Sequence, residues 1–323
     1  MARRTLDSSP GILPLYARAA APLIPGASLL PFVPGRAAEV PDTELVLAGV
    51  RPDRERVAAY ARVCGFPLRD ALPATYPHVL AFPLHMATMA DGSFPFGAVG
   101  LVHVGNSIVQ HRPLGIGEEL KLVVRPTPLQ PHKRGRTFAI ETEAWAGRQK
   151  AWESTSTFLH RGKAGTPAEV SSAMRTEPRP RGGENGDDGA PGEDGLTVGA
   201  VWKLGGDLGR RYGSVSGDRN PIHMHSLTAK PLGFPSAIAH GMWTKARCLA
   251  ALDGRLPDAF AVDVAFRKPI RLPGRVEFLS DAGDEQIEFA VRDAKRHTPH
   301  LDGSVKPVEA KPRPDETSGR KNK

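Results

Sequence analysis

Alternating apolar and polar residues mark two series of short strands, one in each half of the chain. Such alternation is typical of antiparallel strands that place one face on a core and the other in water. The predicted strands lie at residues 120–124, 138–143 and 152–159 in the first half and at 262–267, 276–278 and 287–291 in the second half.

Helical segments precede each series of strands. In the first half we expect helices at 53–64 and at 74–90, although Pro77 and Pro83 fall within the second of them. In the second half a helix begins at His240 and is ended by Gly254; its apolar face consists of Met242, Ala246, Leu249 and Ala250. Both halves therefore have the same order, helices followed by antiparallel strands.

A weak internal repeat supports the comparison of the two halves. It pairs residues 60–66 with 212–218 and residues 111–114 with 267–270. Phe66 stands where the second copy has Asp218, and no Asn-Pro-x-x-His sequence follows it. We therefore expect two copies of one fold, of which the first has kept the shape and lost the chemical groups.

Composition divides the chain further. With 323 residues, two domains are the natural expectation. We predict an N-terminal arm, a degenerate first domain, a flexible linker rich in Pro, Gly and charge, a second domain and a disordered basic tail, at residues 1–43, 44–161, 162–197, 198–305 and 306–323. The arm either packs against the first domain or touches a partner.

The run from residue 212 to 252 concentrates polar chemistry. Asp218 and His223 flank the Asn220-Pro221 dipeptide, where a residue before proline is extended and the chain turns. A short loop of this kind lets the two side chains converge on one small volume. A histidine titrates near neutrality and burial tunes an aspartate, so the pair suits acid and base catalysis.

The helix that begins after His240 supplies a complementary group. Gly241 lies in its first turn, where a backbone N–H is open to a ligand and the helix dipole adds partial positive charge. A donor in this position suits a carbonyl oxygen that becomes an oxyanion. Gly241 is therefore the candidate oxyanion-hole residue.

The order Y-x-x-x-S-G-D-x-N-P-I-H, followed by G-F and by I-A-H-G-M at a helix start, resembles the signature of the MaoC-like (R)-specific enoyl-thioester hydratases and dehydratases. The resemblance implies an α+β class and a double hot-dog fold, with two curved antiparallel sheets each wrapped around a central helix. It also implies interconversion of (R)-3-hydroxyacyl and trans-2-enoyl thioesters, with Asp218 and His223 catalytic and Gly241 in the oxyanion hole. Some members have a serine where this chain has Leu249.

The expected mechanism divides proton transfer between two groups. One group removes a C2 proton and the other protonates the departing C3 hydroxyl. We place Asp218 at C2 and His223 at the oxygen, and the reverse is chemically acceptable. Asn220 orients the loop or binds water, Ser216 bonds to the backbone near Asp218, and His240 supports the helix start.

Other readings of the same residues stay open. Asp-x-Asn-Pro alone is usually a turn or helix cap. His223, His225 and His240 could ligate a metal, although the resemblance implies a metal-free mechanism without a cofactor. A hot-dog thioesterase would hydrolyse the same thioesters, and a noncatalytic module would only bind them. In the first half, His85, His103 and His111 are expected to be packing residues, with His85 a candidate for the cavity wall.

Charge and cysteine content set the expected surroundings. The net charge of +8 comes without a zinc-finger, recognition-helix or RNA-binding signature, so we expect no nucleic-acid partner. A basic surface instead suits the phosphates of coenzyme A or the acidic face of an acyl carrier protein. The two cysteines do not indicate a disulfide framework. The sequence also contains no long apolar run of the kind that predicts a membrane span. We expect a cytoplasmic protein, either a monomeric double hot dog or a homodimer.

Overall fold

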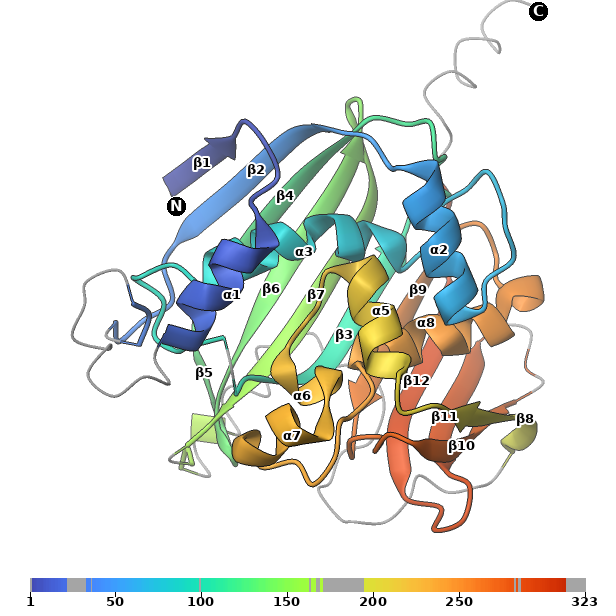
Figure 1. Cartoon of the computed structure of the whole chain (residues 1–323). Coiled ribbons are helices and arrows are strands. Elements are labelled where there is room, and N and C mark those ends of the chain that lie inside the picture. Colours follow the sequence, from blue (N-terminus) through green and yellow to red (C-terminus); the bar gives the residue numbers. More distant parts are fainter. Residues whose placement is uncertain are drawn as a thin grey trace, which may run out of the picture.

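The computed structural model describes residues 2–21, 33–35, 37–98, 100–162, 164–166, 169–170, 195–281, 283 and 286–311. Within these residues a single curved sheet of twelve strands forms one layer, and the helices lie on one of its faces (Figure 1). An N-terminal segment with β1 (Ala2–Leu6) and α1 (Ile12–Ala20) precedes two halves of similar element order.

Each half begins with a strand, continues with helices and ends with antiparallel strands. The first half contains β2 (Thr43–Val50), α2 (Arg54–Cys64), α3 (Tyr76–Met89), β3 (Val102–Gln110), β4 (Leu120–Pro126), β5 (Gln130–His132), β6 (Gly135–Ala146) and β7 (Gln149–Arg161). The second half contains β8 (Thr197–Leu204), α5 (Leu208–Ser216), α6 (Pro221–Met224), α7 (Ser226–Ala229), η3 (Lys230–Leu232), α8 (Gly241–Ala251), η4 (Asp253–Arg255), β9 (Phe260–Phe266), β10 (Gly274–Ser280), β11 (Ile287–Asp293) and β12 (Pro299–Pro307).

The two halves share one sheet. Its strand order is β1-β2-β4-β6-β7-β3-β9-β12-β11-β10-β8, with β5 paired to β6. At the junction, β3 and β9 run antiparallel and pair from Gly105 with Ala265 to Gln110 with Phe260. The sequence predicted two sheets, one around each central helix. Edge-to-edge pairing of β3 with β9 joins them, which leaves neither of these two strands with an unpaired edge.

The central helices α3 and α8 pack their apolar side chains on the concave side of the sheet. Ala81 and Leu84 of α3 are fully buried, as are Ala246 and Leu249 of α8. Leu249, where some family members have a serine, therefore belongs to the core. Burial of apolar surface of this kind contributes roughly 25 cal/mol for each Å² removed from water, which makes this layer the main source of stability.

Local sequence signals explain where the flanking helices begin and end. Asp53 caps α2 by accepting a hydrogen bond from the N–H of Arg56 (2.8 Å). Helices α2 and α5 both end at a glycine in the left-handed region, Gly65 at φ 84° and Gly217 at φ 78°. Only glycine adopts this conformation without a steric penalty. The repeat seen in the sequence is thus a repeat of the same helix ending.

Most predicted elements are confirmed, with boundaries that differ by a few residues. The helices expected at 53–64, 74–90 and from His240 correspond to α2, α3 and α8, although α8 ends at Ala251, before Gly254. Each expected strand is present. Cys64 and Cys248 are buried and free. In the described part of the chain no helix is long and apolar enough to cross a membrane.

One predicted boundary is wrong, at the C-terminal end. Lys306 and Pro307, expected to begin a disordered tail, are the last residues of β12 and pair with β9. Gly303 obscured this strand, because glycine weakens a strand pattern. It is required there because a Cβ would approach the Phe289 ring to 2.4 Å. Residues 312–323, like residues 171–194 of the predicted linker, lie outside the described residues, and β8 already begins at Thr197.

Candidate active site

The connection from α5 to α8 carries the predicted site and packs directly on α5. A Cβ on Gly209 would lie 1.9 Å from the carbonyl oxygen of His223. A Cβ on Gly213 would lie 2.7 Å from the carbonyl oxygen of Asp218. Because only glycine leaves room for so close an approach, the two glycines fix how near the connection lies to the helix.

The two carboxylate oxygens of Asp218 have different hydrogen-bond partners. Oδ1 accepts hydrogen bonds from the backbone N–H of Asn220 (3.1 Å) and from the hydroxyl of Tyr16 (3.0 Å). Oδ2 lies 3.8 Å from Nε2 of His240. The side chain is 27% exposed and borders a cavity. Oδ2 is therefore the oxygen that remains available to a ligand.

The imidazole of His223 has a defined tautomer. Its Nδ1 lies 2.8 Å from the carbonyl oxygen of Ile238. A carbonyl oxygen only accepts hydrogen bonds, so Nδ1 carries the hydrogen and Nε2 carries the lone pair. His223 is buried and lines the same cavity as Asp218. It therefore offers a second acceptor beside Oδ2 of Asp218.

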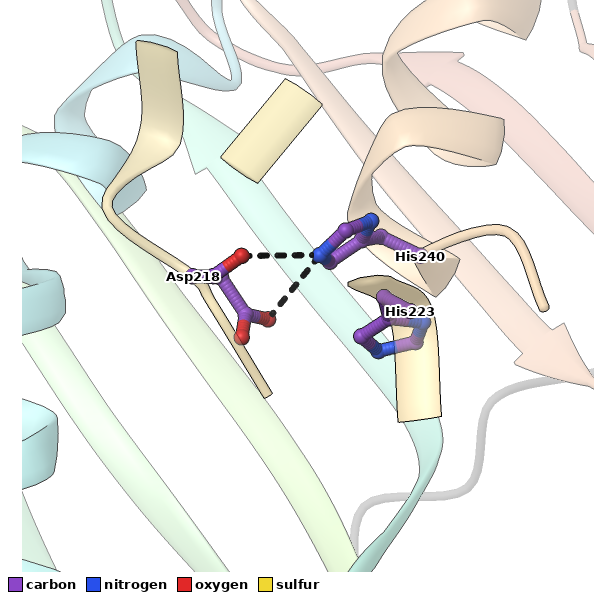
Figure 2. Close-up of side chains that lie close together, drawn as sticks. All are labelled: Asp218, His223 and His240. Carbon is purple, nitrogen blue, oxygen red and sulfur yellow. Dashed lines mark hydrogen bonds and ion pairs between the residues drawn. The ribbon is translucent and has the colours of Figure 1, made fainter. Parts of the chain in front are cut away.

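His240 connects the two candidate catalytic residues. Figure 2 shows its Nε2 directed at Asp218, where it donates to the backbone carbonyl oxygen (3.0 Å). Its ring stacks on that of His223, with 3.7 Å between the ring centroids. Its own backbone precedes the first residue of α8. His240 thus ties the Asp218 turn to the helix start.

Burial and mutual contacts set the protonation states of this group. Burial opposes the charge of Asp218, but the two histidines, Asn220 and Tyr16 outweigh it and lower its pKa. Burial lowers the pKa of His223 from 6.5, although Asp218 and the Ile238 carbonyl partly offset this effect. Burial and His223 lower the pKa of His240 to about 3. At neutral pH the site therefore holds one carboxylate and two neutral imidazoles.

A cavity of about 360 Å³ lies beside these residues and reaches the first turn of α8. Gly241 lines it, and as the first residue of the helix its N–H has no partner within the helix. A Cβ at this position would meet the Phe266 ring at 3.0 Å. Glycine at 241 therefore leaves space at the end of the helix where the partial positive charge is concentrated.

The opposite wall of the cavity belongs to the first half. Helix α3 contributes Val79, Phe82, Met86 and Met89, and β7 contributes Phe158. Three histidines of the first half also line the cavity, His78, His85 and His103, and burial lowers the pKa of each of them. Each neutral ring carries no charge but keeps one N–H donor and one lone pair. The wall of the first half thus combines apolar side chains with uncharged polar rings, while the carboxylate lies in the second half.

Asp218, His223 and His240 each offer a possible metal-ligating atom, and these atoms lie within 4.8 Å of one another. A ligating nitrogen needs a lone pair. Nε2 of His240 carries the hydrogen that it donates to the Asp218 carbonyl, and its Nδ1 is buried without a partner. As placed, Nε2 of His240 is therefore engaged by the Asp218 carbonyl and does not offer a lone pair to a metal. The expectation of a metal-free mechanism stays a prediction.

The structure brings together every predicted site residue. Ser216 accepts a hydrogen bond from the N–H of Asp218 (3.2 Å), and Asn220 caps α6 by accepting from the N–H of Ile222 (3.3 Å). His225 caps α7 on the exposed surface and lies apart from the cavity. Trp243 does not line the cavity, since its Nε1–H is bonded to the Val63 carbonyl (3.1 Å).

Sequence reasoning missed Tyr16. It lies in α1, some 200 positions before Asp218, and its hydroxyl also accepts the N–H of Arg219 (2.7 Å). No spacing in the sequence links these positions. The only signal was a tyrosine in an apolar N-terminal segment.

Comparisons with known proteins cover both halves of the chain. A model described as the MaoC-like domain matches residues 205–302. The 3-hydroxyacyl-thioester dehydratase X of Mycobacterium tuberculosis is 34% identical over 280 residues, which are 87% of this chain and 94% of that protein. A crystal structure of HtdX from M. tuberculosis has a TM-score of 0.69 and 32% identity, and the match covers 82% of this chain and 100% of that one. A MaoC-like dehydratase from Phytophthora capsici, 18% identical, shares the fold with a TM-score of 0.66 over 84% of this chain and 96% of that one.

Proposed function

The chain belongs to the MaoC-like dehydratase family, and we propose that it interconverts (R)-3-hydroxyacyl and trans-2-enoyl thioesters of coenzyme A or an acyl carrier protein. One observation carries the proposal. The Asp218 carboxylate and the neutral His223 ring border the same cavity as the N-terminus of α8. Two proton acceptors beside a helix-end donor are what reversible addition of water to an enoyl thioester requires.

The substrate lies with its reacting carbons at the polar end of the cavity. Its thioester carbonyl oxygen accepts a hydrogen bond from the N–H of Gly241, and the helix end stabilises the enolate that forms there. Its acyl chain follows the apolar wall formed by Val79, Phe82 and Met86 of α3. The first half thus supplies binding surface and the second half supplies chemistry.

Hydration uses the two acceptors to hold one water molecule. Nε2 of His223 and Oδ2 of Asp218 each accept one of its hydrogens, which leaves an oxygen lone pair for C3 of the enoyl chain. As the C–O bond forms, one hydrogen passes to Asp218 and from there to C2. The other hydrogen stays on oxygen as the product hydroxyl. No proton has to be bound to the pair beforehand, and none remains there afterwards.

Dehydration follows the same path in reverse. Asp218 takes a proton from C2, the C3–O bond breaks, and the proton that Asp218 took joins the departing oxygen to complete the water molecule. In this proposed path Asp218 acts at C2, which is the role that the sequence analysis gave it. His223 differs from that expectation, because at neutral pH its Nε2 holds the hydroxyl hydrogen as an acceptor and does not supply a proton.

The rim of the cavity suits a phosphorylated carrier. Arg134 and Arg161 of the first half and Arg267 and Lys268 of the second half line it. Guanidinium and ammonium groups bind phosphate by charge-assisted hydrogen bonds. Both coenzyme A and the phosphopantetheine of a carrier protein present phosphate, so the rim supports either carrier. No cofactor takes part in the proposed reaction. A cytoplasmic location and the oligomeric state stay predictions.

Product analysis tests the proposal against its alternatives. The protein is incubated with crotonyl-CoA or a medium-chain trans-2-enoyl-CoA, and the products are identified by mass spectrometry after chiral chromatography. The proposal predicts a product heavier than the enoyl thioester by one water, with the R configuration. Free acid would indicate a thioesterase. An unchanged thioester that binds the protein would indicate a noncatalytic module. The exposed variant Asp207→Asn, outside the cavity, controls for the general effect of removing a carboxylate.

A further inference from the structure

We propose that Tyr16 is a positioning residue for Asp218, so that the N-terminal arm forms part of the active site. The inference rests on the proposed function, because it concerns the carboxylate that moves the proton. Tyr16 lies in α1 and reaches Asp218 in the second half of the chain. In Figure 1, α1 lies beside α3 on the helical side of the sheet, and α5 also lies next to α3.

The hydroxyl of Tyr16 makes two hydrogen bonds to the catalytic turn. It donates to Oδ1 of Asp218 (3.0 Å) and accepts from the backbone N–H of Arg219 (2.7 Å). The second bond orients the first, because the hydroxyl uses its oxygen for the N–H and its hydrogen for the carboxylate. Together they fix both the turn and the rotation of the carboxyl group.

These bonds decide which carboxylate oxygen reacts. Oδ1 is occupied by Tyr16 and by the N–H of Asn220, whereas Oδ2 is directed toward His240. Loss of the Tyr16 hydroxyl would leave Oδ1 with one strong donor. The carboxyl group could then rotate, and Oδ2 would spend less time in reach of C2. A misplacement of this kind reduces the rate of proton transfer more than it weakens substrate binding.

The rest of α1 holds the arm in place independently of this hydroxyl. Leu15 and Ala19 of α1 are buried in the core, while Tyr16 is half-buried and lines the cavity with Ala19. Removal of the one oxygen atom at Tyr16 therefore breaks its hydrogen bonds and leaves the packing of the arm in place, whereas a variant at Leu15 disturbs both.

Tyr16 acts as a donor and not as a proton carrier. Burial and the neighbouring Asp218 raise the pKa of its hydroxyl far above the ordinary value, so it keeps its proton at any working pH. Its hydrogen bond favours the ionised form of Asp218. The other titratable groups that act on Asp218 or on which Asp218 acts are His223, His240, His78, His103 and Tyr212.

The test compares Tyr16→Phe with the wild type in enoyl-CoA hydration. A hydrogen bond to a charged group contributes enough that we expect kcat to fall about tenfold to a hundredfold, with KM changed less than about threefold. The pKa of the Asp218 carboxyl rises, because Asp218 loses a donor that favours its charge. Tyr76→Phe, which removes a hydroxyl that does not line the cavity, is the matched control and keeps wild-type kinetics. Leu15→Ala loosens the helix that carries Tyr16 and should raise the same pKa.

A second readout does not depend on turnover. The carboxyl carbon of Asp218 is followed by NMR in protein labelled at aspartate, with its signal assigned from Asp218→Asn. We expect the pH midpoint of the Asp218 titration to rise in Tyr16→Phe and to stay unchanged in Tyr76→Phe. An unchanged kcat and an unchanged titration midpoint of Asp218 in Tyr16→Phe would overturn the role of Tyr16 while leaving the proposed function intact. If the wild type hydrates no enoyl thioester, the function fails and the NMR midpoint still decides whether Tyr16 controls Asp218.

Discussion

Helices α2 and α5 are equivalent elements of the two halves, and they end in the same way. Each is followed by a glycine in the left-handed conformation, and each contains a buried tyrosine, Tyr60 or Tyr212. The next residue is Phe66 in the first half and Asp218 in the second. The same backbone turn therefore packs an apolar side chain against the core in one half and presents a carboxylate to a cavity in the other.

The connections that follow differ as well. In the second half, the segment between Gly217 and α8 contains α6 and α7, which place His223 beside Asp218. The shorter segment between Gly65 and α3 contains no described helix. The second half therefore differs from the first by more than the residue that follows the glycine. His223 lies in an additional segment that has no counterpart in the first half.

Each central helix covers the helix ending of the opposite half. Phe82 of α3 lies 3.7 Å from where a Cβ of Gly217 would be, and α3 forms the apolar wall of the cavity. At the other ending, Trp243 and Arg247 of α8 lie against Val63 and Gly65. Side chains thus fill the space beside the helix ending of the first half, and the first half supplies a wall for the site of the second.

The largest effect is expected from exchanging the residues that distinguish the two helix endings. Asp218→Phe copies the first half into the second and removes a proton-transfer group, so hydration activity should fall by about a hundredfold to ten-thousandfold. Phe66→Asp should create no second activity, because Trp243 and Arg247 fill the adjoining space and no histidine follows. Steady-state rates, with circular dichroism to confirm folding, measure both. Substantial activity in Asp218→Phe would show that the comparison has identified the wrong residue.

The pH dependence of the wild type sharpens the assignment of protonation states. Burial lowers the pKa of His223 from 6.5, and the pKa of Asp218 is also lowered. Both groups must be unprotonated in the proposed path, so kcat/KM should be level from neutral to mildly alkaline pH. The acid limb of this profile should lie under pH 6.5, and below it kcat/KM should fall about tenfold per pH unit. A loss of kcat/KM as pH rises through neutrality would instead require a protonated imidazole.

A smaller effect is expected at the end of α8. Gly241→Ala adds a Cβ that would lie 3.0 Å from the Phe266 ring. Relief of this contact should displace the backbone N–H of residue 241 from the thioester oxygen. Removing an oxyanion donor costs about a hundredfold or more, and a displaced one should cost about tenfold in kcat. Gly254→Ala, where nothing lies within 4 Å, is the matched control and should retain full activity. Equal activities of the two variants would argue against a role for Gly241.

The smallest effect should fall on the contact between the halves, away from the site. Trp243→Phe removes the Nε1–H that donates to the Val63 carbonyl (3.1 Å) and leaves most of the ring packing. The free energy of unfolding should decrease by about 1 kcal/mol, with kcat unchanged. Denaturant unfolding measures the first and initial rates the second. A large loss of kcat would mean that loss of this contact shifts α8 and changes the position of Gly241.

Much of the fold could be predicted because the two halves follow simple rules. Periodicity located α2, α3, α8 and half of the twelve strands, and the left-handed glycines after α2 and α5 aligned the repeat. The joining of β3 to β9 could not be predicted, because edge pairing between two halves depends on their relative placement. Strand β12 was not predicted, because Gly303 and two prolines disguise its alternation.

The site shows the same division between local and long-range information. Asp218, Asn220 and His223 lie within six residues, so their convergence followed from a turn that the sequence makes explicit. The tautomer of His223 depends on Ile238, and the choice of Oδ2 depends on Tyr16. These partners meet only when the chain is folded. What the sequence could not predict is therefore how the catalytic groups are held.

The central claim is that the Asp218 and His223 pair of the second half adds water to an enoyl thioester. It is tested most directly by following the loss of enoyl absorbance with crotonyl-CoA and with a medium-chain trans-2-enoyl-CoA. The wild type, Asp218→Asn and His223→Ala are compared as folded proteins. The account predicts activity in the wild type and a loss of about a hundredfold or more in each variant. A wild type inactive on these substrates and on their carrier-protein forms, or folded variants as active as the wild type, would contradict it.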